Sequence, residues 1–219
     1  KKKLQKEKDG DKRVELYKLI SKYHNMQNNL KTTLNSAFGA MGNEHFRYFD
    51  QRIAEAVTTS GQLSIKWIEK EINRYLNEIL KPEEKKDYVV AVDTDSVYIC
   101  MDDLVKTIYG DTIDDKNKVV DFLDKVCSEQ MEKIIDTSYQ KLAEYVNAYD
   151  QKMVMKRENI ADRALWTAKK RYIMNVHDAE GVRYEKPQLK VMGIESVRSS
   201  TPAACKEKMK GIFNIIMNG

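Results

Sequence analysis

The chain has 219 residues, of which 42% are hydrophobic and 33% are charged, and its formal net charge is +4. This length accommodates one large or two small domains with a hydrophobic core, and no apolar run approaches the roughly 20 residues that a membrane-spanning helix needs. Because 34 acidic residues dilute 38 basic ones, the overall charge permits a nucleic-acid partner without arguing for one.

The first long helix is predicted from about Lys12 to Met41. Lys31, Asn35 and Phe38 lie along one strip of it, at i, i+4 and i+7. A cation, an amide and an aromatic ring in line can hold a phosphate, a second phosphate or sugar group, and a base. The same spacing also describes an ordinary amphipathic helix whose polar side faces water. Apolar residues on a neighbouring face recur at steps of three and four: Tyr23, Met26, Leu30, Leu34 and Ala37.

Two further long helices are predicted. One runs from Gln51 to Leu80, where Lys81-Pro82 ends it, and its predicted buried side comprises Ile53, Val57, Trp67, Ile68, Ile72, Tyr75, Leu76 and Ile79. The other follows a loop around Gly110–Asp115, runs from about Lys116 to Tyr149, and has apolar positions at Val119, Leu123, Val126, Ile134, Leu142 and Val146.

A β-hairpin with two carboxylates at its tip is predicted between these helices. The apolar runs Tyr88–Val92 and Val97–Met101 flank Asp93, Thr94, Asp95 and Ser96, a pattern of two strands and a tight turn. Because the tip has no glycine, turn geometry alone does not explain its residues. Two carboxylates so close repel each other unless a cation is present, and paired Mg²⁺ ions are the usual remedy. The alternative is a solvated acidic turn.

Strands are predicted again in the last third of the chain. Lys152–Ile160 and Arg171–His177 read as strands, and Val182–Tyr184 and Gln188–Met192 return along the second. Ser200-Thr201-Pro202 then precedes a final helix that runs to Gly219. Because helices and antiparallel strands occur in separate blocks, the fold class is predicted to be α+β, with an antiparallel sheet and the acidic hairpin packed on long helices.

Several of these segments together resemble family B DNA polymerases. Lys31–Gly39 resembles their motif B, Lys-x-x-x-Asn-Ser-x-Tyr-Gly, and Val92–Ser96 resembles motif C. Trp166–Tyr172, which contains Lys-Lys-Arg-Tyr, resembles the element that grips the primer strand. Further segments are similar to the versions in large tailed bacteriophages: Phe46–Asp50, Leu189–Glu195 and Ser199–Pro202. The resemblance covers the chain from about Asn28 to its end.

The resemblance implies a domain assignment and a chemistry. Residues 1–42 match part of the fingers, including their second helix, 43–198 match the palm, and 199–219 match the start of the thumb. The activity implied is template-directed nucleotidyl transfer by a two-metal mechanism. Asp95 matches the carboxylate that ligates two Mg²⁺ ions, Asp93 matches the one beside them, and Glu158 matches an acid near the metals.

The resemblance also implies the binding residues. Those for the incoming nucleotide are Lys31, Asn35, Ser36, Phe38 and Gly39, and those for DNA are Lys169, Lys170, Arg171, Tyr172 and Lys190. Phe38 stands where the family usually has tyrosine, so a hydroxyl at the new base pair is absent. For the three consecutive basic residues the alternative is a solvated strand end.

Motif A of the family, Asp-x-x-Ser-Leu-Tyr-Pro, occurs nowhere in the 219 residues. We therefore expect a catalytic piece that is completed by the remaining polymerase segments, in cis or in a second chain, with a remnant of the first fingers helix near Lys1–Lys3. The alternative is a non-catalytic remnant or split-polymerase subunit that binds primer–template DNA. The partners implied are primer–template DNA and deoxynucleoside triphosphates, without a membrane, in the cytoplasm (that of the host if the source is viral).

Overall fold

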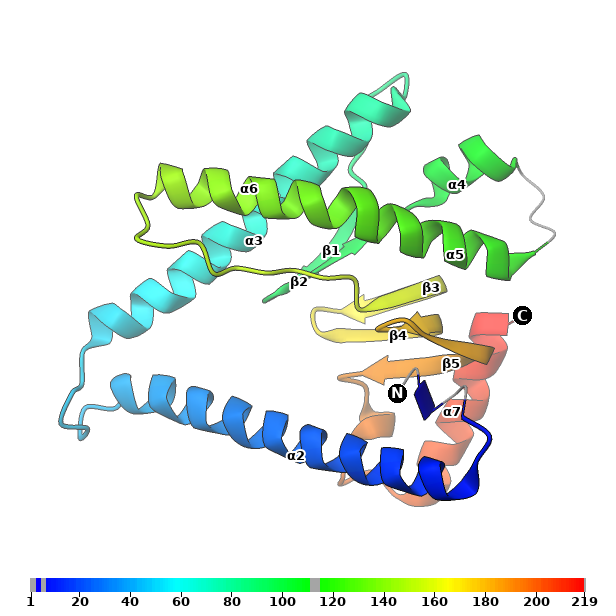
Figure 1. The fold of residues 1–219 in the computed structure, drawn as a ribbon, viewed down its shortest axis with the longest axis horizontal. Helices are drawn as coiled ribbons and strands as arrows, with labels where there is room; N and C mark the ends of the chain where they lie inside the picture. Colours follow the sequence, from blue (N-terminus) through cyan, green and yellow to red (C-terminus); the bar gives the residue numbers. More distant parts are fainter. Residues whose placement is uncertain (1–2, 5–6, 111–114, 219) are drawn as a thin grey trace. The chain divides into compact units, whose positions relative to one another are not determined.

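The computed structural model describes residues 3–4, 7–110 and 115–218 (Figure 1). The predicted helix remnant near Lys1–Lys3 and the predicted loop at Gly110–Asp115 fall largely outside these residues. The α+β class is confirmed. In chain order the elements are helices α2 (Gly10–Met41) and α3 (Gln51–Leu80), strands β1 (Val89–Asp93) and β2 (Ser96–Ile99), helices α4 (Asp102–Tyr109) and α5 (Lys116–Val126), a π-helical turn (Cys127–Met131), helix α6 (Glu132–Tyr145), strands β3 (Asn159–Ala168), β4 (Arg171–Ala179) and β5 (Val182–Met192), a 3₁₀ turn (Glu195–Val197) and helix α7 (Ala203–Asn218).

The chain divides into two compact units, Lys1–Leu63 and Ser64–Gly219. In the first unit, Asp9 caps helix α2 by accepting hydrogen bonds from the backbone N–H groups of the first turn, yet no residue of α2 is buried. Ile53 and Val57, predicted to be buried, are 45% and 51% exposed. That prediction is wrong because a unit built from two helices is too small to bury most of its apolar side chains. No described helix is both long and apolar enough to cross a bilayer.

The main core of the second unit lies between the last part of α3, helix α6 and strand β1. The indole N–H of Trp67 on α3 donates to the carbonyl of Ser138 on α6 at 3.1 Å, which joins the two helices. Ile79, predicted on the same face, is instead 48% exposed near the end of α3. The buried residues of this core are Ile68, Ile72, Leu76, Tyr88, Val89, Met131, Ile135, Tyr139 and Leu142.

The predicted helix over Lys116–Tyr149 is interrupted by the π-helical turn Cys127–Met131. A π turn holds an extra residue, so every position after it moves one place around the helix. Ile135 therefore enters the core, and Ile134, which the uninterrupted period predicted, is only half-buried. Val146 lies just beyond α6 and is exposed.

The strands form two antiparallel sheets. β1 and β2 make a hairpin in which Val92 pairs with Val97 and Asp93 with Ser96, and the second sheet has the order β3-β4-β5. Strand β3 begins at Asn159, not Lys152, and it includes the segment Ala161–Trp166 that the sequence left outside any strand. The register of β3 against β4 shifts at several points, and these irregularities conceal a strand period in the sequence.

Strand β4 is central and buried on both faces. Tyr172, Met174 and Val176 lie in one cluster with Tyr98 of β2 and Trp166 of β3. Ile173, on the other face, packs with Ile194 and with Phe213 and Met217 of α7. Ahead of α7, the hydroxyl of Thr201 donates to the carbonyl of Glu195 at 2.6 Å. This layering places the hairpin tip beside the end of the β3–β5 sheet.

Candidate active site

The tip of the β1–β2 hairpin is a strained turn that carries two carboxylates. Thr94 has φ 54°, a conformation that β-branched residues rarely adopt. The N–H of Asp95 and the hydroxyl of Ser96 donate to the carbonyl of Asp93 at 2.6 and 3.1 Å, and the hydroxyl of Thr94 donates to the Asp93 carboxylate at 3.1 Å. Asp93 is half-buried and Asp95 is exposed. Backbone strain of this kind clusters at functional sites.

Two asparagines of α3 hold the chain that enters this hairpin. Asn73 Oδ1 accepts the N–H groups of Tyr88 and Val89 at 2.8 and 3.2 Å. One turn later, Asn77 Oδ1 accepts the N–H of Lys86 at 2.9 Å, and its Nδ2 donates to the Lys86 carbonyl at 2.7 Å. Asn77 thus pairs with the Lys86 backbone in both directions, as an edge strand would, while the Nδ2 of Asn73 donates to Asp87 Oδ1 at 2.6 Å. Sequence reasoning missed the two asparagines, although their i, i+4 spacing on one face of α3 was a usable signal.

The β3–β4 turn brings a lysine to the hairpin tip. Lys170 Nζ lies 3.6 Å from Asp93 Oδ1, so a predicted DNA-binding residue and a predicted metal ligand meet. Lys170 has φ 63°. Arg171 Nη1, directly after it, lies 3.6 Å from Glu195 Oε1. The turn is therefore fixed by its backbone and by ion pairs on two sides.

An aromatic cluster joins the hairpin to the sheet beneath this turn. The ring of Tyr98 contacts Trp166 and Tyr172 edge-on, with centroids 5.3 and 5.4 Å apart, a preferred geometry for aromatic pairs. Burial raises the pKa of Tyr172 well above its usual range, and the hydrogen bond with Tyr98 and the charges of Glu158 and Asp93 add to the effect. The Tyr172 hydroxyl therefore stays protonated within the field of two candidate site carboxylates.

Glu158 and Lys190 are brought together as an ion pair. Lys190 Nζ on β5 lies 2.8 Å from Glu158 Oε1, and this hydrogen bond lowers the pKa of Glu158. The candidate acid and one candidate DNA-binding lysine thus compensate each other's charge.

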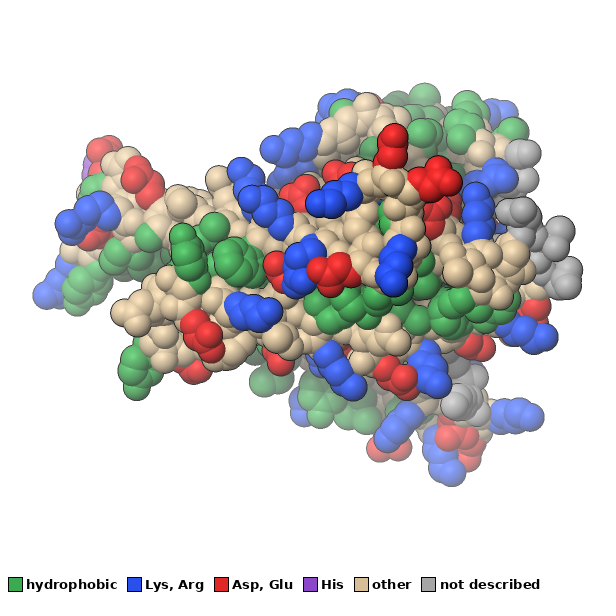
Figure 2. Space-filling view, turned by 90° about the horizontal axis from the view of Figure 1, so that it is seen from above, with side chains coloured by type: hydrophobic (Ala, Val, Ile, Leu, Met, Phe, Trp, Pro, Cys, Tyr) green, Lys and Arg blue, Asp and Glu red, His purple; other side chains and the backbone are tan. Residues whose placement is uncertain are grey.

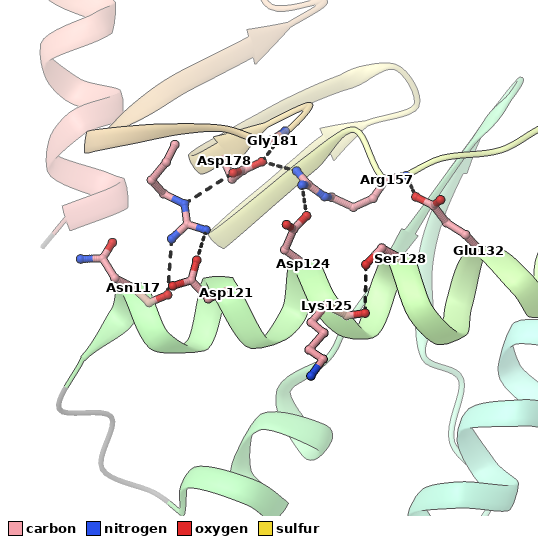
Figure 3. Close-up of polar contacts among 10 residues, drawn as sticks. Asn117, Asp121, Asp124, Lys125, Ser128, Glu132, Arg157, Asp178 and Gly181 are labelled. Atoms are coloured by element: carbon pink, nitrogen blue, oxygen red, sulfur yellow. Dashed lines mark hydrogen bonds and ion pairs between the residues drawn. The ribbon is translucent and has the colours of Figure 1, made fainter. Parts of the chain in front are cut away.

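Residue 157 fixes the chain next to Glu158. Figure 3 shows Arg157 reaching from the segment before β3 to Asp124 on α5 and to Asp178 on β4. The backbone N–H of Arg157 also donates to Glu132 Oε1 at 3.2 Å. Burial by itself raises the pKa of Asp178, but hydrogen bonds from Arg157, Gly181 and Arg183 outweigh it and hold that pKa below its usual value.

The candidate nucleotide-binding residues lie on helix α2 of the first unit, where Ser36, Phe38 and Gly39 are solvent-exposed. Lys31 and Asn35 line an open groove on this helix, together with Tyr23, Met26, Gln27, Leu30 and Leu34. A cation and an amide beside an apolar strip suit a ligand that has both a charged and a flat apolar part.

Charged side chains are numerous and of both signs, and the candidate metal donors do not cluster within the described residues. On the face drawn in Figure 2, basic and acidic side chains are intermingled and no field of one sign dominates. Within the described ranges no three His, Cys, Asp or Glu side chains gather as a metal site. The carboxylates at the hairpin tip are therefore a pair, Asp93 and Asp95, and any cation they bind needs further ligands.

All of residues 1–219 match the family model described as DNA polymerase family B. The chain is 44% identical over 192 residues to a DNA-directed DNA polymerase of Escherichia phage RB69, which covers 84% of this chain and 21% of that protein. It is 41% identical over 202 residues to the DNA-directed DNA polymerase of Enterobacteria phage T4, covering 88% and 22%. The chain spans about a fifth of the length of these relatives. It belongs to DNA polymerase family B.

Proposed function

We propose that this chain supplies the palm (43–198), part of the fingers (1–42) and the start of the thumb (199–219) of a phage-type DNA-directed DNA polymerase. In the complete enzyme it would take part in template-directed nucleotidyl transfer from deoxynucleoside triphosphates to a primer–template. The segments with motif A would come from the same polypeptide or from a second chain.

The hairpin tip is the proposed metal-binding part of the site. Its donors are carboxylate oxygens, which fit Mg²⁺, an ion commonly held by one or two carboxylates together with substrate phosphates. Asp95 would ligate two ions, with Asp93 beside them and Glu158 as a further acid nearby. Bound Mg²⁺ supplies charge neutralisation at a transferring phosphoryl group. Lys170 lies against Asp93 and would orient it, and the exposed Asp95 is accessible to substrate.

Helix α2 is the proposed nucleotide-binding part. Lys31 and Asn35 would contact the triphosphate, because a cation and an amide one helical turn apart can bind successive phosphate oxygens. Ser36, Phe38 and Gly39 would line the new base pair. Phe38 offers a ring without a hydroxyl, so it can pack against the base pair but cannot hydrogen-bond in the minor groove.

The β3–β4 turn is the proposed primer grip. Lys169, Lys170 and Arg171 would bind backbone phosphates, with Tyr172 beneath the turn and Lys190 on the neighbouring strand. Such contacts position DNA without reading its sequence and weaken as salt rises. The single observation that carries the proposal is the 3.6 Å approach of Lys170 to Asp93, because it unites an acidic turn and a basic turn at one place.

Substitutions in the complete polymerase test the proposal. Asp95→Asn should lower kcat by several orders of magnitude with DNA affinity nearly unchanged, since it removes a metal ligand and no DNA contact. Lys31→Ala should mainly raise KM for the incoming nucleotide. Primer extension at the parent rate by both variants would refute the assignment of both motifs. Primer–template binding without any nucleotide incorporation by the parent enzyme would favour the non-catalytic alternative.

A further inference from the structure

We propose that Gly193 is a positioning residue for the primer grip: its lack of a side chain allows the β3–β4 turn to close and so places Lys170 for phosphate binding. This inference rests on the proposed DNA-binding role of that turn. Gly193 has no side chain of its own to bind DNA. The atoms closest to a Cβ at position 193 belong to the Lys170 backbone, with Arg171 Cγ next at 3.3 Å, so its effect would act mainly through the backbone of Lys170.

The contact between Gly193 and the turn is made by backbone atoms. Gly193 directly follows β5, whose last residue, Met192, pairs with Tyr172. A Cβ atom at position 193 would lie 2.0 Å from the carbonyl oxygen of Lys170 and 3.1 Å from its carbonyl carbon. Neither atom can rotate away as a side chain could, so any other residue at 193 must displace the turn.

The local backbone is restrictive on both sides of this contact. Gly193 has φ 67° and Lys170 has φ 63°, both in the left-handed region that favours glycine. A turn position of this kind is usually filled by glycine or asparagine, and turn geometry gives no reason for a lysine. The side chain of Lys170, which reaches Asp93, supplies the reason.

The residues after Gly193 hold the other end of the turn. Glu195 Oε1 lies 3.6 Å from Arg171 Nη1 and 3.7 Å from Arg198 Nη2. The hydroxyl of Thr201 donates to the Glu195 carbonyl at 2.6 Å. This hydrogen bond fixes the connector between β5 and α7, residues 193–202. The connector therefore supports the turn at two successive residues, at the Lys170 backbone and at the Arg171 side chain.

A double-mutant cycle tests the inference. The binding of labelled primer–template DNA to the 219-residue chain is measured by fluorescence anisotropy across a salt series, for the parent, Gly193→Ala, Lys170→Ala and the double variant. Loss of one phosphate contact should reduce the slope of log K against log salt by about 0.9. We expect this reduction in each single variant, and no further reduction in the double variant, because Gly193 acts through Lys170.

Gly211→Ala in α7 is the matched control, because a Cβ there meets nothing within 4 Å, and its DNA binding should equal that of the parent. If Gly193→Ala reduces the slope of log K against log salt by the same amount in the parent and in the Lys170→Ala variant, the positioning role is overturned. Such a result would indicate a general loss of structure. If Lys170→Ala alone leaves both the DNA affinity and its salt slope unchanged, the proposed primer grip itself is refuted.

A second variant covers the case in which circular dichroism shows Gly193→Ala to be unfolded. One glycine inserted between Lys169 and Lys170 moves Lys170 without adding a Cβ at position 193. The same reduced slope is expected. An unchanged slope would overturn the inference, because the placement of Lys170 would then be irrelevant to DNA binding.

Discussion

Arg157 and Asp178 form the most buried ion pair among the described residues, with side chains that are 11% and 3% exposed. Removing the guanidinium takes one cationic partner from a buried carboxylate, which keeps the N–H of Gly181 at 2.8 Å and Arg183 at 3.5 Å. Loss of one partner of a buried ion pair typically costs about 3–5 kcal/mol. We therefore predict that Arg157→Met lowers the free energy of unfolding, measured by urea denaturation, by about that amount. Arg74→Met is the control. Its partners Glu71 and Glu78 lie on the surface of α3, so the loss should stay below about 1 kcal/mol. An equal loss of unfolding free energy in the Arg157→Met and Arg74→Met variants would contradict the structural role of Arg157.

The pKa values of Asp178 and Asp162 predict how stability depends on pH. Burial favours protonation of both groups, but hydrogen bonds from Arg157 to Asp178 and from Lys116 to Asp162 outweigh burial and lower both pKa values. A carboxyl whose folded-state pKa is lowered stabilises the fold above its unfolded pKa, near 4, and this contribution is lost as pH falls through the folded pKa. The free energy of unfolding should therefore decrease below about pH 4.

Asp178→Asn checks this assignment. The variant is less stable at neutral pH, but it has one fewer carboxyl to protonate, so its free energy of unfolding should fall less steeply between about pH 4 and pH 2. Urea titrations at several pH values measure the slope. A slope equal to that of the parent would show that Asp178 does not contribute to acid unfolding.

Substitution of Gly39 tests whether this residue serves nucleotide binding or only the structure of α2. A Cβ at this position of α2 meets nothing within 4 Å, so Gly39→Ala should stabilise the helix by about 0.5–1 kcal/mol. If Gly39 lies against the new base pair, the same substitution in the complete polymerase should raise KM for the incoming nucleotide. Gly211→Ala should give a similar gain in stability with KM unchanged. An unchanged KM for Gly39→Ala would remove Gly39 from the nucleotide site.

Lys170 should show a trade-off between stability and binding. Its left-handed backbone is strained for a lysine, so Lys170→Gly should raise the free energy of unfolding by about 0.5–1 kcal/mol after the entropy that glycine adds to the unfolded chain. The same variant should bind DNA less tightly at low salt. Chemical denaturation and anisotropy measure the two effects. A loss of stability would show that the contact with Asp93 outweighs the strain.

The sequence predicted helices far better than it predicted their burial. The bounds of α3 agree with the prediction because a long apolar period and Lys81-Pro82 mark it clearly. Exposure at Ile53 could not be predicted, since period alone does not reveal whether a second layer covers a face. Helix α4 is only eight residues long, too short to show a period, although Asp102 and Asp103 in its first turn and the following Gly110 were available signals.

Local motifs single out the candidate site residues one at a time and do not reveal which of them pair. Asp93 and Lys170 were each singled out from local motifs, but their approach depends on how the aromatic cluster seats the hairpin on the sheet. The Glu158–Lys190 pair likewise joins residues 32 positions apart. Contacts of this range follow from strand order and register, which no local pattern contains.

The π-helical turn has a consequence for chain length. Successive residues of a helix are about 100° apart, a value set by 3.6 residues per turn. Deleting one of the exposed residues of the π turn, Ser128, Glu129 or Gln130, would restore a continuous α-helix. Ile135, Tyr139 and Leu142 would each move one place back in the sequence, to the positions that an uninterrupted helix turns toward α3, so they would keep their core contacts. A deletion scan should therefore find these three positions more tolerant of a lost residue than α6 after Ile135, where a deletion would leave the π turn in place and rotate Tyr139 and Leu142 away from α3 by about 100°.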